Sequence, residues 1–373
     1  MSADHQSARP DSEQIVGVLK EVKAYERRVA LTPHGAATLV ADGRAVIVET
    51  RAGIGSGFDD AEYVAAGARI APDASDVFDS ATLLLHVKEP QPSEFPSFRP
   101  HHTLFTYLHL AAAPDVADAL CASGCRAIAY ESIEVDRHFP LLAPMSMVAG
   151  RLATQIAASY LEARNGGRGM LMGGLPGVEP TTVLVIGAGV SGRHAAEVAA
   201  GMGAEVIVAD LNLERARAVA RDCGPLARAI VSSPRAIEEL APITEVMVGA
   251  VLAPSHKAPI VITKRILDAM PEGSVVVDIA IDQGGCVEDV QPTSHADPVR
   301  LMGHVRVSAT PNMPATVPRS STAALTAATL PYVRALAGGW SSAVEAHPEL
   351  AGAINVESGQ VVHPAVAADL ARK

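Results

Sequence analysis

The chain has 373 residues, of which 49% are hydrophobic and 19% charged, and its formal net charge is -11. This length exceeds what one hydrophobic core usually organises, so we expect two domains. The acidic balance, without a cluster of Lys and Arg, argues against nucleic acid as a partner, and no apolar run reaches the roughly 18 residues that a membrane helix needs. The polar start is unlike a signal peptide, so we expect a cytoplasmic protein that acts on small molecules.

The four cysteines do not suggest a disulfide framework in a chain of this length. Cys121, Cys125, Cys223 and Cys286 also lack the paired spacing of a zinc site, so we expect no metal. Cys286 follows two glycines and could line a pocket, but we interpret it as a small buried apolar residue.

The first part of the chain alternates between predicted strands and helices. Thr32 and Pro33 supply an N-cap and a first-turn proline for a helix over 34–42. Strands separated by helices indicate βαβ units and a mostly parallel sheet, because a parallel neighbour is reached only through a crossover. The predicted strands here are 15–20, 45–49, 83–88, 103–108 and 127–130, and the further helices are 59–66 and 114–123.

An alanine-rich helix over 147–163 leads from this part to a second alternation, which starts with the strand VLVIGAG at Val183. Two later runs, 246–252 and 274–282, are almost continuously apolar, which is typical of central parallel strands covered on both faces. The other predicted elements are a strand over 206–210 and helices over 191–202, 215–220 and 321–337.

These patterns predict an α/β fold of two Rossmann-like, doubly wound domains with mostly parallel sheets and a deep cleft between them. We expect a substrate or catalytic domain made of residues 1–139 plus 319–373, because the last helix should return to the first domain. Residues 140–318 would then form an NAD-binding Rossmann domain.

A glycine-rich sequence, GAGVSG, lies between an apolar strand and a predicted helix. Gly187 would permit the tight turn, Gly189 would let a pyrophosphate approach the backbone, and Gly192 would let helix and strand pack closely. Asp210 closes the next predicted strand, where a carboxylate can accept both hydroxyls of the adenosine ribose. The pattern predicts a dinucleotide site and favours NAD, although the nearby Arg215 leaves NADP(H) open.

Polar residues at the carboxyl ends of strands are candidates for catalysis, because ligands of open α/β sheets bind at that edge. Lys88 ends LLLHVK, His109 ends TLFTYLH and Asp282 ends SVVVDIAID, while Arg28 precedes the turn after the first strand. Each alone is weak evidence, since such residues are commonly solvated, structural or capping. Together, three from the first domain and one from the second, they predict a cleft in which cofactor meets substrate.

Seven further motifs are spread along the chain: ERRVALTP (26–33), VKEP (87–90), FTYLHLAA (105–112), LLAPMS (141–146), NGGRG (165–169), DIAIDQGG (278–285) and NMP (312–314). In these motifs the sequence resembles the alanine dehydrogenase family over almost its whole length. The related proton-translocating transhydrogenase shares part of the pattern, but lacks most of the substrate motifs and needs membrane partners.

The resemblance implies the roles of the candidate residues. Arg28 and Lys88 would bind the substrate carboxylate and carbonyl, Lys88 and His109 would act in catalysis with His109 as general acid/base, and Asp282 would assist proton transfer. The segment around Asn312 would touch the substrate. This fits the chemistry, because removal of hydride from C2 of an amino acid yields an iminium whose hydrolysis to a 2-oxo acid and ammonia needs a base.

The same resemblance assigns a second set of residues to the cofactor. Ser146, Asp210, Arg215 and Met313 would contact NAD, although a serine at a helix start often serves as a cap and a methionine often belongs to the core. The family forms hexamers, so the resemblance also implies a homo-oligomer.

The chain departs from the family at several positions. Met147 replaces a glutamate that is usual there, and Pro311 precedes Asn312, which would stiffen the loop. Ala324 and Ala327 stand where bulkier or polar residues are usual, and such changes alter substrate discrimination by about 1 to 3 kcal/mol. These changes leave open which amino acid is preferred, while we expect the reaction class to survive.

Three readings of the sequence follow. The leading one is reversible, NAD-dependent oxidative deamination of L-alanine to pyruvate and ammonia by hydride transfer. A second is a related NAD(P)H-dependent enzyme that acts on another amino acid, a cyclic imine or an opine-type substrate. A third, from a different class, is a transhydrogenase-like or catalytically silent module that binds NADH without turnover.

Overall fold

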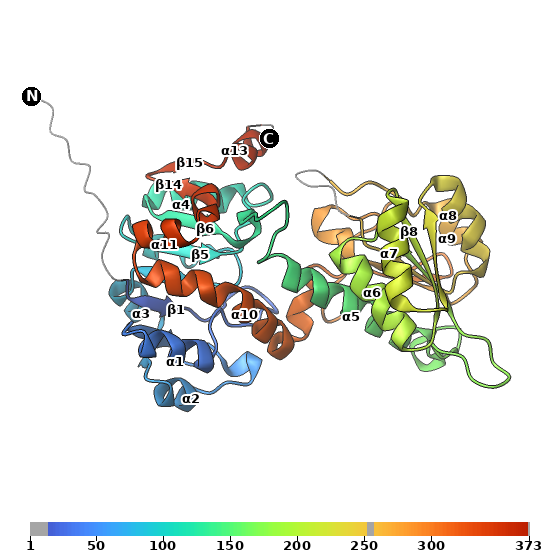
Figure 1. Cartoon of the computed structure of the whole chain (residues 1–373), viewed down its shortest axis with the longest axis horizontal. Helices are drawn as coiled ribbons and strands as arrows, with labels where there is room; N and C mark the ends of the chain where they lie inside the picture. Colours follow the sequence, from blue (N-terminus) through green and yellow to red (C-terminus); the bar gives the residue numbers. More distant parts are fainter. Residues whose placement is uncertain (1–13, 252–256, 372–373) are drawn as a thin grey trace, which may run out of the picture. The chain divides into compact units, whose positions relative to one another are not determined.

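The computed structural model describes residues 14–251 and 257–371. The chain divides into two compact units (Figure 1). Unit 1 comprises Met1–Pro144 and Val317–Lys373, and unit 2 comprises Met145–Thr316. Each unit is built around its own sheet, so the predicted α/β architecture of two Rossmann-like domains is confirmed.

Unit 1 contains an eight-stranded mixed sheet in the order β15-β14-β6-β5-β4-β1-β2-β3. Neighbours from β6 to β3 pair in parallel, whereas β14 is antiparallel to β6 and β15 is antiparallel to β14. The central strands are buried on both faces because helices cover them. The strands are β1 (Val16–Val18), β2 (Val46–Glu49), β3 (Arg69–Ala71), β4 (Leu83–Leu85), β5 (Thr103–Thr106), β6 (Arg126–Ala129), β14 (Ile354–Glu357) and β15 (Gln360–Val361).

Some helices of unit 1 begin at residues whose side chains cap them. The Thr32 side chain accepts a hydrogen bond from the N–H of Gly35, as predicted, and Asp59 forms a capping box with Glu62. The helices are α1 (Pro33–Ala41), α2 (Asp60–Ala65), α3 (Ala74–Ser80), α4 (Pro114–Ser123), α10 (Pro318–Ala337), α11 (Trp340–Ala346), α12 (Glu349–Gly352) and α13 (Pro364–Leu370), with 3-10 turns η1 (Ile54–Ser56), η2 (Phe95–Ser97) and η3 (Tyr130–Ser132).

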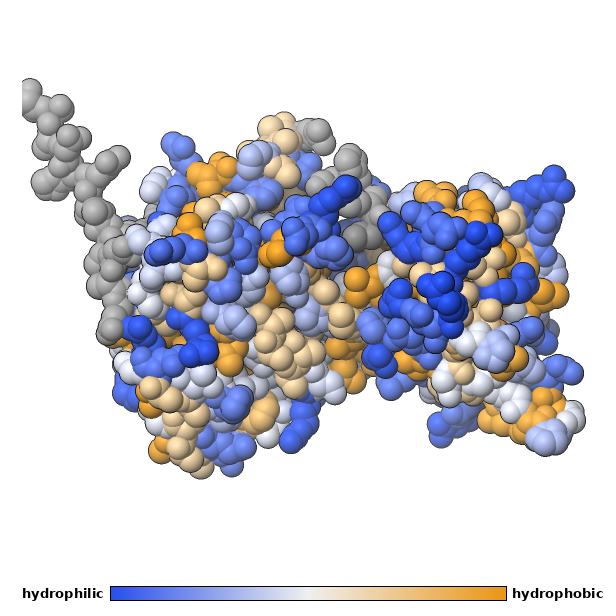
Figure 2. All heavy atoms as spheres, viewed as in Figure 1, coloured by the Kyte–Doolittle hydropathy of each residue, from blue (hydrophilic) through white to orange (hydrophobic). Residues whose placement is uncertain are grey.

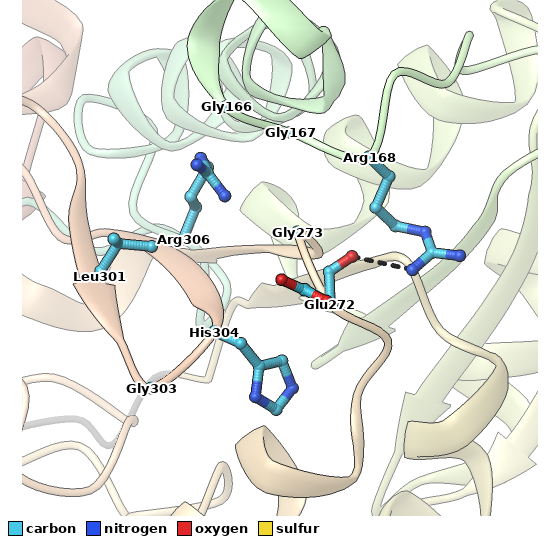
Figure 3. A pocket seen from close by; sticks show the side chains of 9 residues that line it. All are labelled: Gly166, Gly167, Arg168, Glu272, Gly273, Leu301, Gly303, His304 and Arg306. Carbon is cyan, nitrogen blue, oxygen red and sulfur yellow. Dashed lines mark hydrogen bonds between the residues drawn. The ribbon is translucent and has the colours of Figure 1, made fainter.

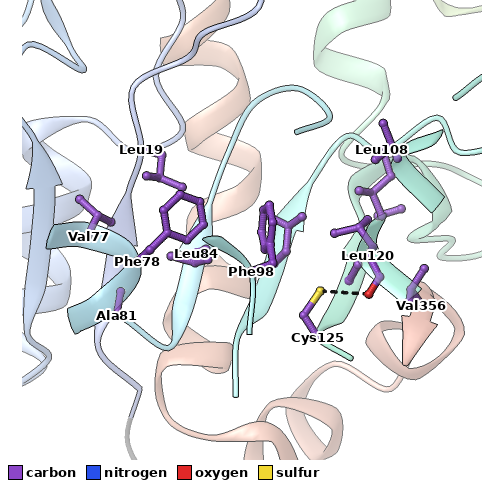
Figure 4. Packing of buried hydrophobic residues seen from close by; sticks show 14 of the residues in the cluster. Leu19, Val77, Phe78, Ala81, Leu84, Phe98, Leu108, Leu120, Cys125 and Val356 are labelled. Atoms are coloured by element: carbon purple, nitrogen blue, oxygen red, sulfur yellow. Dashed lines mark hydrogen bonds between the residues drawn. The ribbon is translucent and has the colours of Figure 1, made fainter. Parts of the chain in front are cut away.

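The core of unit 1 joins segments that are far apart in the sequence (Figure 4). Leu84 of β4 and Val356 of β14 are completely buried in one cluster with Leu120 of α4. Phe78 of α3 and Phe98 meet edge to face, with ring centroids 5.2 Å apart. This packing fixes the strand ends that carry the candidate residues of unit 1.

Unit 2 contains a seven-stranded sheet in the order β12-β13-β11-β10-β7-β8-β9. All neighbours pair in parallel except β12, which is antiparallel to β13. The two almost continuously apolar runs form the fully buried strands β10 and β11, which confirms their predicted central position. The strands are β7 (Thr182–Ile186), β8 (Glu205–Asp210), β9 (Ala227–Val231), β10 (Val246–Gly249), β11 (Val275–Asp278), β12 (Arg300–Met302) and β13 (Val305–Ser308).

The long helix α5 packs closely on α6, because Gly150 has no side chain. A Cβ at Gly150 would lie 2.1 Å from the carbonyl oxygen of Ser191, and Thr154 Oγ1 donates a hydrogen bond to the carbonyl of Ala195 at 2.9 Å. The remaining helices are α5 (Ala143–Leu161), α6 (Val190–Gly201), α7 (Leu213–Cys223), α8 (Pro234–Leu240) and α9 (Lys264–Ala269), with 3-10 turns η4 (Ala163–Asn165), η5 (Ala241–Ile243), η6 (Ile279–Gln283) and η7 (Met313–Thr316).

Several predicted strands extended too far. The strands predicted to end at Lys88 and Leu108 end at Leu85 and Thr106, and the one predicted to end at Asp282 ends at Asp278. The prediction was wrong for Asp282 because the Asp278 side chain accepts the N–H of Ala280 at 2.9 Å and starts η6. The predicted strand 246–252 ends at Gly249, and its last residue lies outside the described ranges.

Within the described ranges, none of the helices combines the length and apolarity of a membrane span. Apolar side chains nevertheless reach the surface in one loop of unit 2. Leu171, Leu175 and Val178 are exposed there, together with Met202 at the end of α6. Figure 2 shows apolar residues gathered at the corner of unit 2 where this loop protrudes in Figure 1.

Candidate active site

The GAGVSG sequence connects β7 to α6, and its three glycines meet different constraints. Gly187 has φ 103°, in the left-handed region, and a Cβ there would lie 2.4 Å from the carbonyl oxygen of Ala250. A Cβ at Gly192 would lie 1.7 Å from the carbonyl oxygen of Gly187. The fold therefore requires glycine at both positions.

Gly189 differs, because a Cβ there would meet nothing within 4 Å. Gly189 is the N-cap of α6, and no side chain caps this helix. Folding alone does not explain a glycine here, whereas a ligand that approaches the backbone does. The open N-terminus of α6 presents N–H groups that suit a phosphate.

Asp210 ends β8 beside this loop and is mostly buried. Its carboxylate accepts the N–H of Ala188 at 2.7 Å and the N–H of Asn212 at 2.8 Å, so its position is fixed relative to the glycine loop. Arg215 is exposed on α7, with Nη1 3.9 Å from Asp210 Oδ2. The structure thus brings Gly187, Asp210 and Arg215 together at one edge of the sheet.

A second part of the same edge of unit 2 holds Asp282 and Asn312. The N–H of Asn312 lies 3.1 Å and 3.3 Å from the two carboxylate oxygens of Asp282. Asn312 adopts φ 51°, a left-handed backbone that asparagine tolerates better than most residues. Met313 follows as a buried residue at the start of η7, and half-buried Ser146 lies inside the first turns of α5.

In unit 1, Lys88 lies in the segment after β4, and both of its backbone groups are held. Its N–H donates to Glu21 Oε2 at 3.2 Å, and its carbonyl accepts from Thr106 Oγ1 at 3.0 Å. The Lys88 Nζ lies 3.5 Å from Glu89 Oε2, and Lys23 also pairs with Glu89. The backbone of Lys88 is thus fixed, and its ammonium group forms an ion pair with the Glu89 carboxylate.

His109 follows β5 with φ 48°, a strained left-handed backbone for a side chain of this size. Its N–H donates to Glu131 Oε1 at 2.6 Å, and its ring stacks on that of Tyr107 with centroids 5.8 Å apart. Burial, and then the charges of Lys88, Lys23 and Arg28, hold the pKa of His109 well below 6.5. Water reaches 42% of this side chain and weakens the effect, but its direction favours a neutral imidazole.

Arg28 is buried, with only 2% of the residue exposed. Its Nε donates to Glu26 Oε1 at 2.7 Å and its Nη2 to Glu26 Oε2 at 2.5 Å, a bidentate pair that fixes the guanidinium plane. Burial alone would lower the pKa of Arg28, but the hydrogen bonds and charge of Glu26 outweigh it and raise the pKa. Arg28 therefore remains a cation.

The glutamates that hold these side chains were not among the predicted site residues. Glu131 lies in η3 directly after β6, and its carboxylate accepts the N–H groups of Leu108 and His109. Burial raises the pKa of Glu131, although these hydrogen bonds oppose the shift. Glu21 follows β1 in the same way. Lys88 was selected as a candidate because it is an ionisable residue after a buried strand. The same criterion would have selected both glutamates.

A separate cavity of about 560 Å³ opens in unit 2 (Figure 3). Arg168, Arg306 and His304 line it, and none of the predicted site residues does. Its wall includes Gly273 just before β11 and His304 just before β13, so it lies at the opposite edge of the sheet from the glycine loop after β7. The Cβ of any residue replacing Gly166 would lie 1.9 Å from Arg306 Nη2, so the NGGRG motif serves this packing.

The departures from the family lie at positions of different exposure. Ala327 is exposed on α10, and Ala324 is half-buried on the same helix. Met147 is exposed on α5, and Pro311 is half-buried before Asn312.

Comparisons with known proteins agree with this geometry. Two family models match almost the whole chain: the Alanine dehydrogenase/PNT N-terminal domain over residues 17–149 and the Alanine dehydrogenase/PNT C-terminal domain over residues 153–364. The chain is 47% identical to an alanine dehydrogenase of Mycolicibacterium smegmatis, over 95% of this chain and 96% of that protein. It is 46% identical to an alanine dehydrogenase of Bacillus subtilis, over 95% of this chain and 94% of that protein.

Solved structures give the same result. An L-alanine dehydrogenase structure matches with a TM-score of 0.92 and 44% identity, over 96% of this chain and 99% of that chain. A transhydrogenase from Sinorhizobium meliloti matches with a TM-score of 0.80 and 27% identity, over 94% of this chain and 99% of that chain. The chain therefore belongs to the alanine dehydrogenase/PNT family, whose enzymes use a nicotinamide cofactor.

Proposed function

We propose that this enzyme catalyses the reversible, NAD-dependent oxidative deamination of L-alanine to pyruvate and ammonia. One observation carries the proposal: in unit 1, burial and then the charges of Lys88, Lys23 and Arg28 hold the pKa of His109 below its usual value, which favours a neutral imidazole. A neutral imidazole beside two cations can take a proton while the cations hold an anionic substrate. The names of the curated relatives support alanine as the substrate.

Arg28 and Lys88 bind the substrate in this proposal. The guanidinium of Arg28, fixed in its plane by Glu26, suits a carboxylate, because its donors match two oxygens at once. The ammonium of Lys88 suits the single oxygen that forms at C2. It stabilises the negative charge that develops on this oxygen when the carbinolamine hydroxyl loses its proton and ammonia leaves.

Proton transfer falls to His109 and Asp282. His109 removes a proton from the water molecule that attacks the iminium carbon. It returns a proton when the reaction runs in the direction of reductive amination. Glu131 holds the His109 backbone and faces the ring, with Nδ1 3.7 Å from Oε1, so it stabilises the imidazolium that forms. We assign Asp282 to a supporting role in proton transfer and Asn312, whose N–H it accepts, to contact with the substrate.

The residues of unit 2 fit NAD. The open space at Gly189 and the uncapped start of α6 suit a pyrophosphate, and the Asp210 carboxylate suits the two ribose hydroxyls. A 2′-phosphate would meet the negative charge of Asp210, which favours NAD over NADP. We place Arg215, Ser146 and Met313 along the same cofactor path, and assign unit 2 as the NAD-binding domain and unit 1 as the substrate domain. When bound, NAD accepts the hydride from C2 of the amino acid.

A panel of L-amino acids, assayed for NADH formation, tests the proposal. We expect the highest kcat/KM with L-alanine, and much lower rates when NADP replaces NAD. Faster turnover of another amino acid would correct the substrate, and no turnover of any would refute the reaction class.

We further propose that the enzyme is cytoplasmic and works as a homo-oligomer, a hexamer by resemblance to its family. The exposed apolar side chains of Leu171, Leu175 and Val178 support subunit contact, because such a patch is usually covered. Light scattering of the purified protein measures the subunit number directly, and a monomeric mass would refute the assembly.

A further inference from the structure

A histidine that the proposed mechanism does not use lies two positions before Lys88. His86 has only 1% of its surface exposed and lies between two carboxylates. Its Nδ1 is 3.1 Å from Glu21 Oε1 and its Nε2 is 3.0 Å from Glu94 Oε1. Glu21 comes from the segment after β1 and Glu94 from the residue before η2, so the ring joins three segments of unit 1.

The surroundings of His86 favour its charged form. The two glutamate side chains are themselves only 3% and 7% exposed, so little water screens them. Burial alone would lower the pKa of His86, but the charges of Glu21 and Glu94, together with the hydrogen bond to Glu21, outweigh it and raise the pKa to about 10. Glu49 at the end of β2 also acts on this cluster, and burial raises its pKa, while Lys20 and His86 oppose that shift.

Glu21 links this cluster to the active site. The same Oε1 that faces His86 accepts the N–H of Val87 at 2.7 Å, and Oε2 accepts the N–H of Lys88 at 3.2 Å. Glu94 holds the far end of the segment, because its Oε2 accepts the N–H of Gln91 at 2.7 Å. The imidazole thus lies at the centre of a network that fixes the backbone on both sides of Lys88.

We propose that His86 is a positioning residue whose imidazolium, held between Glu21 and Glu94, orients the Glu21 carboxylate and thereby sets the place of the Lys88 ammonium. This inference rests on the proposed function, in which Lys88 binds the substrate. A positive charge at this site balances two buried carboxylates. Without it, one carboxylate would take up a proton or turn towards water, and the backbone that it holds would lose its anchor.

Two substitutions separate charge from shape. His86→Gln keeps a polar side chain of similar length but removes the charge, whereas His86→Lys keeps the charge. His34→Gln is a matched control, because His34 is exposed on α1 and its backbone carbonyl, which the substitution keeps, accepts a hydrogen bond from Thr38 Oγ1. Steady-state kinetics with pyruvate, ammonia and NADH give kcat and both KM values for each variant.

We expect His86→Gln to lower kcat/KM for pyruvate by about 10- to 100-fold, since displacement of a binding group by about 1 Å has effects of this size. The KM for NADH should stay within about 2-fold of the wild-type value, because the GAGVSG sequence proposed to bind the cofactor lies in unit 2. His86→Lys should recover most of the loss, and His34→Gln should match the wild type. A residue that only stabilised the fold would change the melting temperature and leave these kinetic constants unchanged.

Two results would overturn the inference: a folded His86→Gln enzyme with wild-type kcat/KM for pyruvate, or equal impairment of the Gln and Lys variants. If His86→Gln does not fold, Glu94→Gln replaces it. Glu94→Gln removes the carboxylate charge on the side of His86 that lies away from Lys88, so we expect a smaller loss of kcat/KM for pyruvate. Unchanged kinetics would again overturn the inference.

Failure of the proposed function is distinguishable from failure of this inference. A wild-type protein that turns over no amino acid refutes the function alone. Crystal structures of the wild type and of His86→Gln then decide the inference, because it requires the Lys88 Nζ to occupy different places in the two. Identical places would refute it.

Discussion

The proposed cofactor site of unit 2 and the proposed substrate site of unit 1 are built in different ways. In unit 2 the backbone makes the site: Gly187 and Gly192 allow a turn that no other residue could form, and Gly189 leaves open space. In unit 1 side chains make the site, and glutamates hold them: Glu26 pairs with the Arg28 guanidinium, and Glu131 accepts the backbone N–H of His109. A site shaped by the backbone depends on local spacing, whereas a site of paired charges depends on contacts between distant segments.

The largest effect should come from His109 in unit 1. We expect His109→Asn to lower kcat by 100-fold or more, in line with the loss of a general acid/base, while NADH binding in unit 2 stays near normal. Asparagine tolerates the left-handed backbone of position 109, so the change removes the base without adding strain. Stopped-flow turnover and NADH fluorescence titration measure the two effects. Unchanged turnover would remove His109 from the mechanism.

The glycines of unit 2 sharpen the contrast further. Gly189→Ala should leave the melting temperature unchanged, because its Cβ meets nothing within 4 Å, yet weaken NADH binding by about 10-fold or more by blocking the phosphates. Gly192→Ala should destabilise unit 2 itself, since its Cβ would lie 1.7 Å from a carbonyl oxygen. Thermal melts and NADH titration of both variants check this. Equal stability loss in both would contradict the distinction.

Asp210 gives a smaller effect in the same unit. Asp210→Ser removes the carboxylate that would repel a 2′-phosphate and accept the ribose hydroxyls. We expect about a 10-fold loss in kcat/KM with NAD and a gain with NADP, on the scale of about 1.4 kcal/mol per tenfold change. An Arg215→Ala variant is the control for the other charge at this position. No change in the ratio of the two cofactors would refute the role of Asp210.

The smallest effect should be a pH dependence of stability in unit 1. The raised pKa of His86 means that its ion pairs stabilise the fold fully below pH 6.5 and lose this effect as the pH rises towards about 10. The wild type should therefore melt above His86→Gln by several degrees at pH 6, at about 2–4 °C per kcal/mol, and the gap should narrow by pH 10. Calorimetry over this range measures it, and a gap that widens with pH would contradict the assignment.

The sequence predicted the parts of the molecule that local patterns determine. The glycine fingerprint, Asp210, the buried strands β10 and β11 and the Thr32 cap all follow from spacing and residue type over a few positions. The short strands at the edges of both sheets were not predicted from such local patterns. Strands β3 and β9 are only partly buried, so their pattern of apolar residues is weak, and pairing with a neighbour decides their structure.

The candidate site shows the same limit. Lys88 and His109 could be proposed from the sequence because each follows a buried strand. The exact ends of those strands could not be predicted, since the chain leaves the sheet where side chains such as Glu21 and Asp278 accept backbone N–H groups. Glu131 meets His109 across 22 positions of the sequence. Only the order of β5 and β6 in the sheet brings them together.

The pairing of charges in unit 1 also bears on how fast a substrate arrives. Arg28 faces Glu26, Lys88 and Lys23 share Glu89, and the carboxylates around His86 surround a cation. Opposite charges so close together cancel beyond about one Debye length, roughly 8 Å at physiological ionic strength. An anionic 2-oxo acid is therefore recognised on contact rather than drawn in from a distance, and its association rate should respond only weakly to added salt.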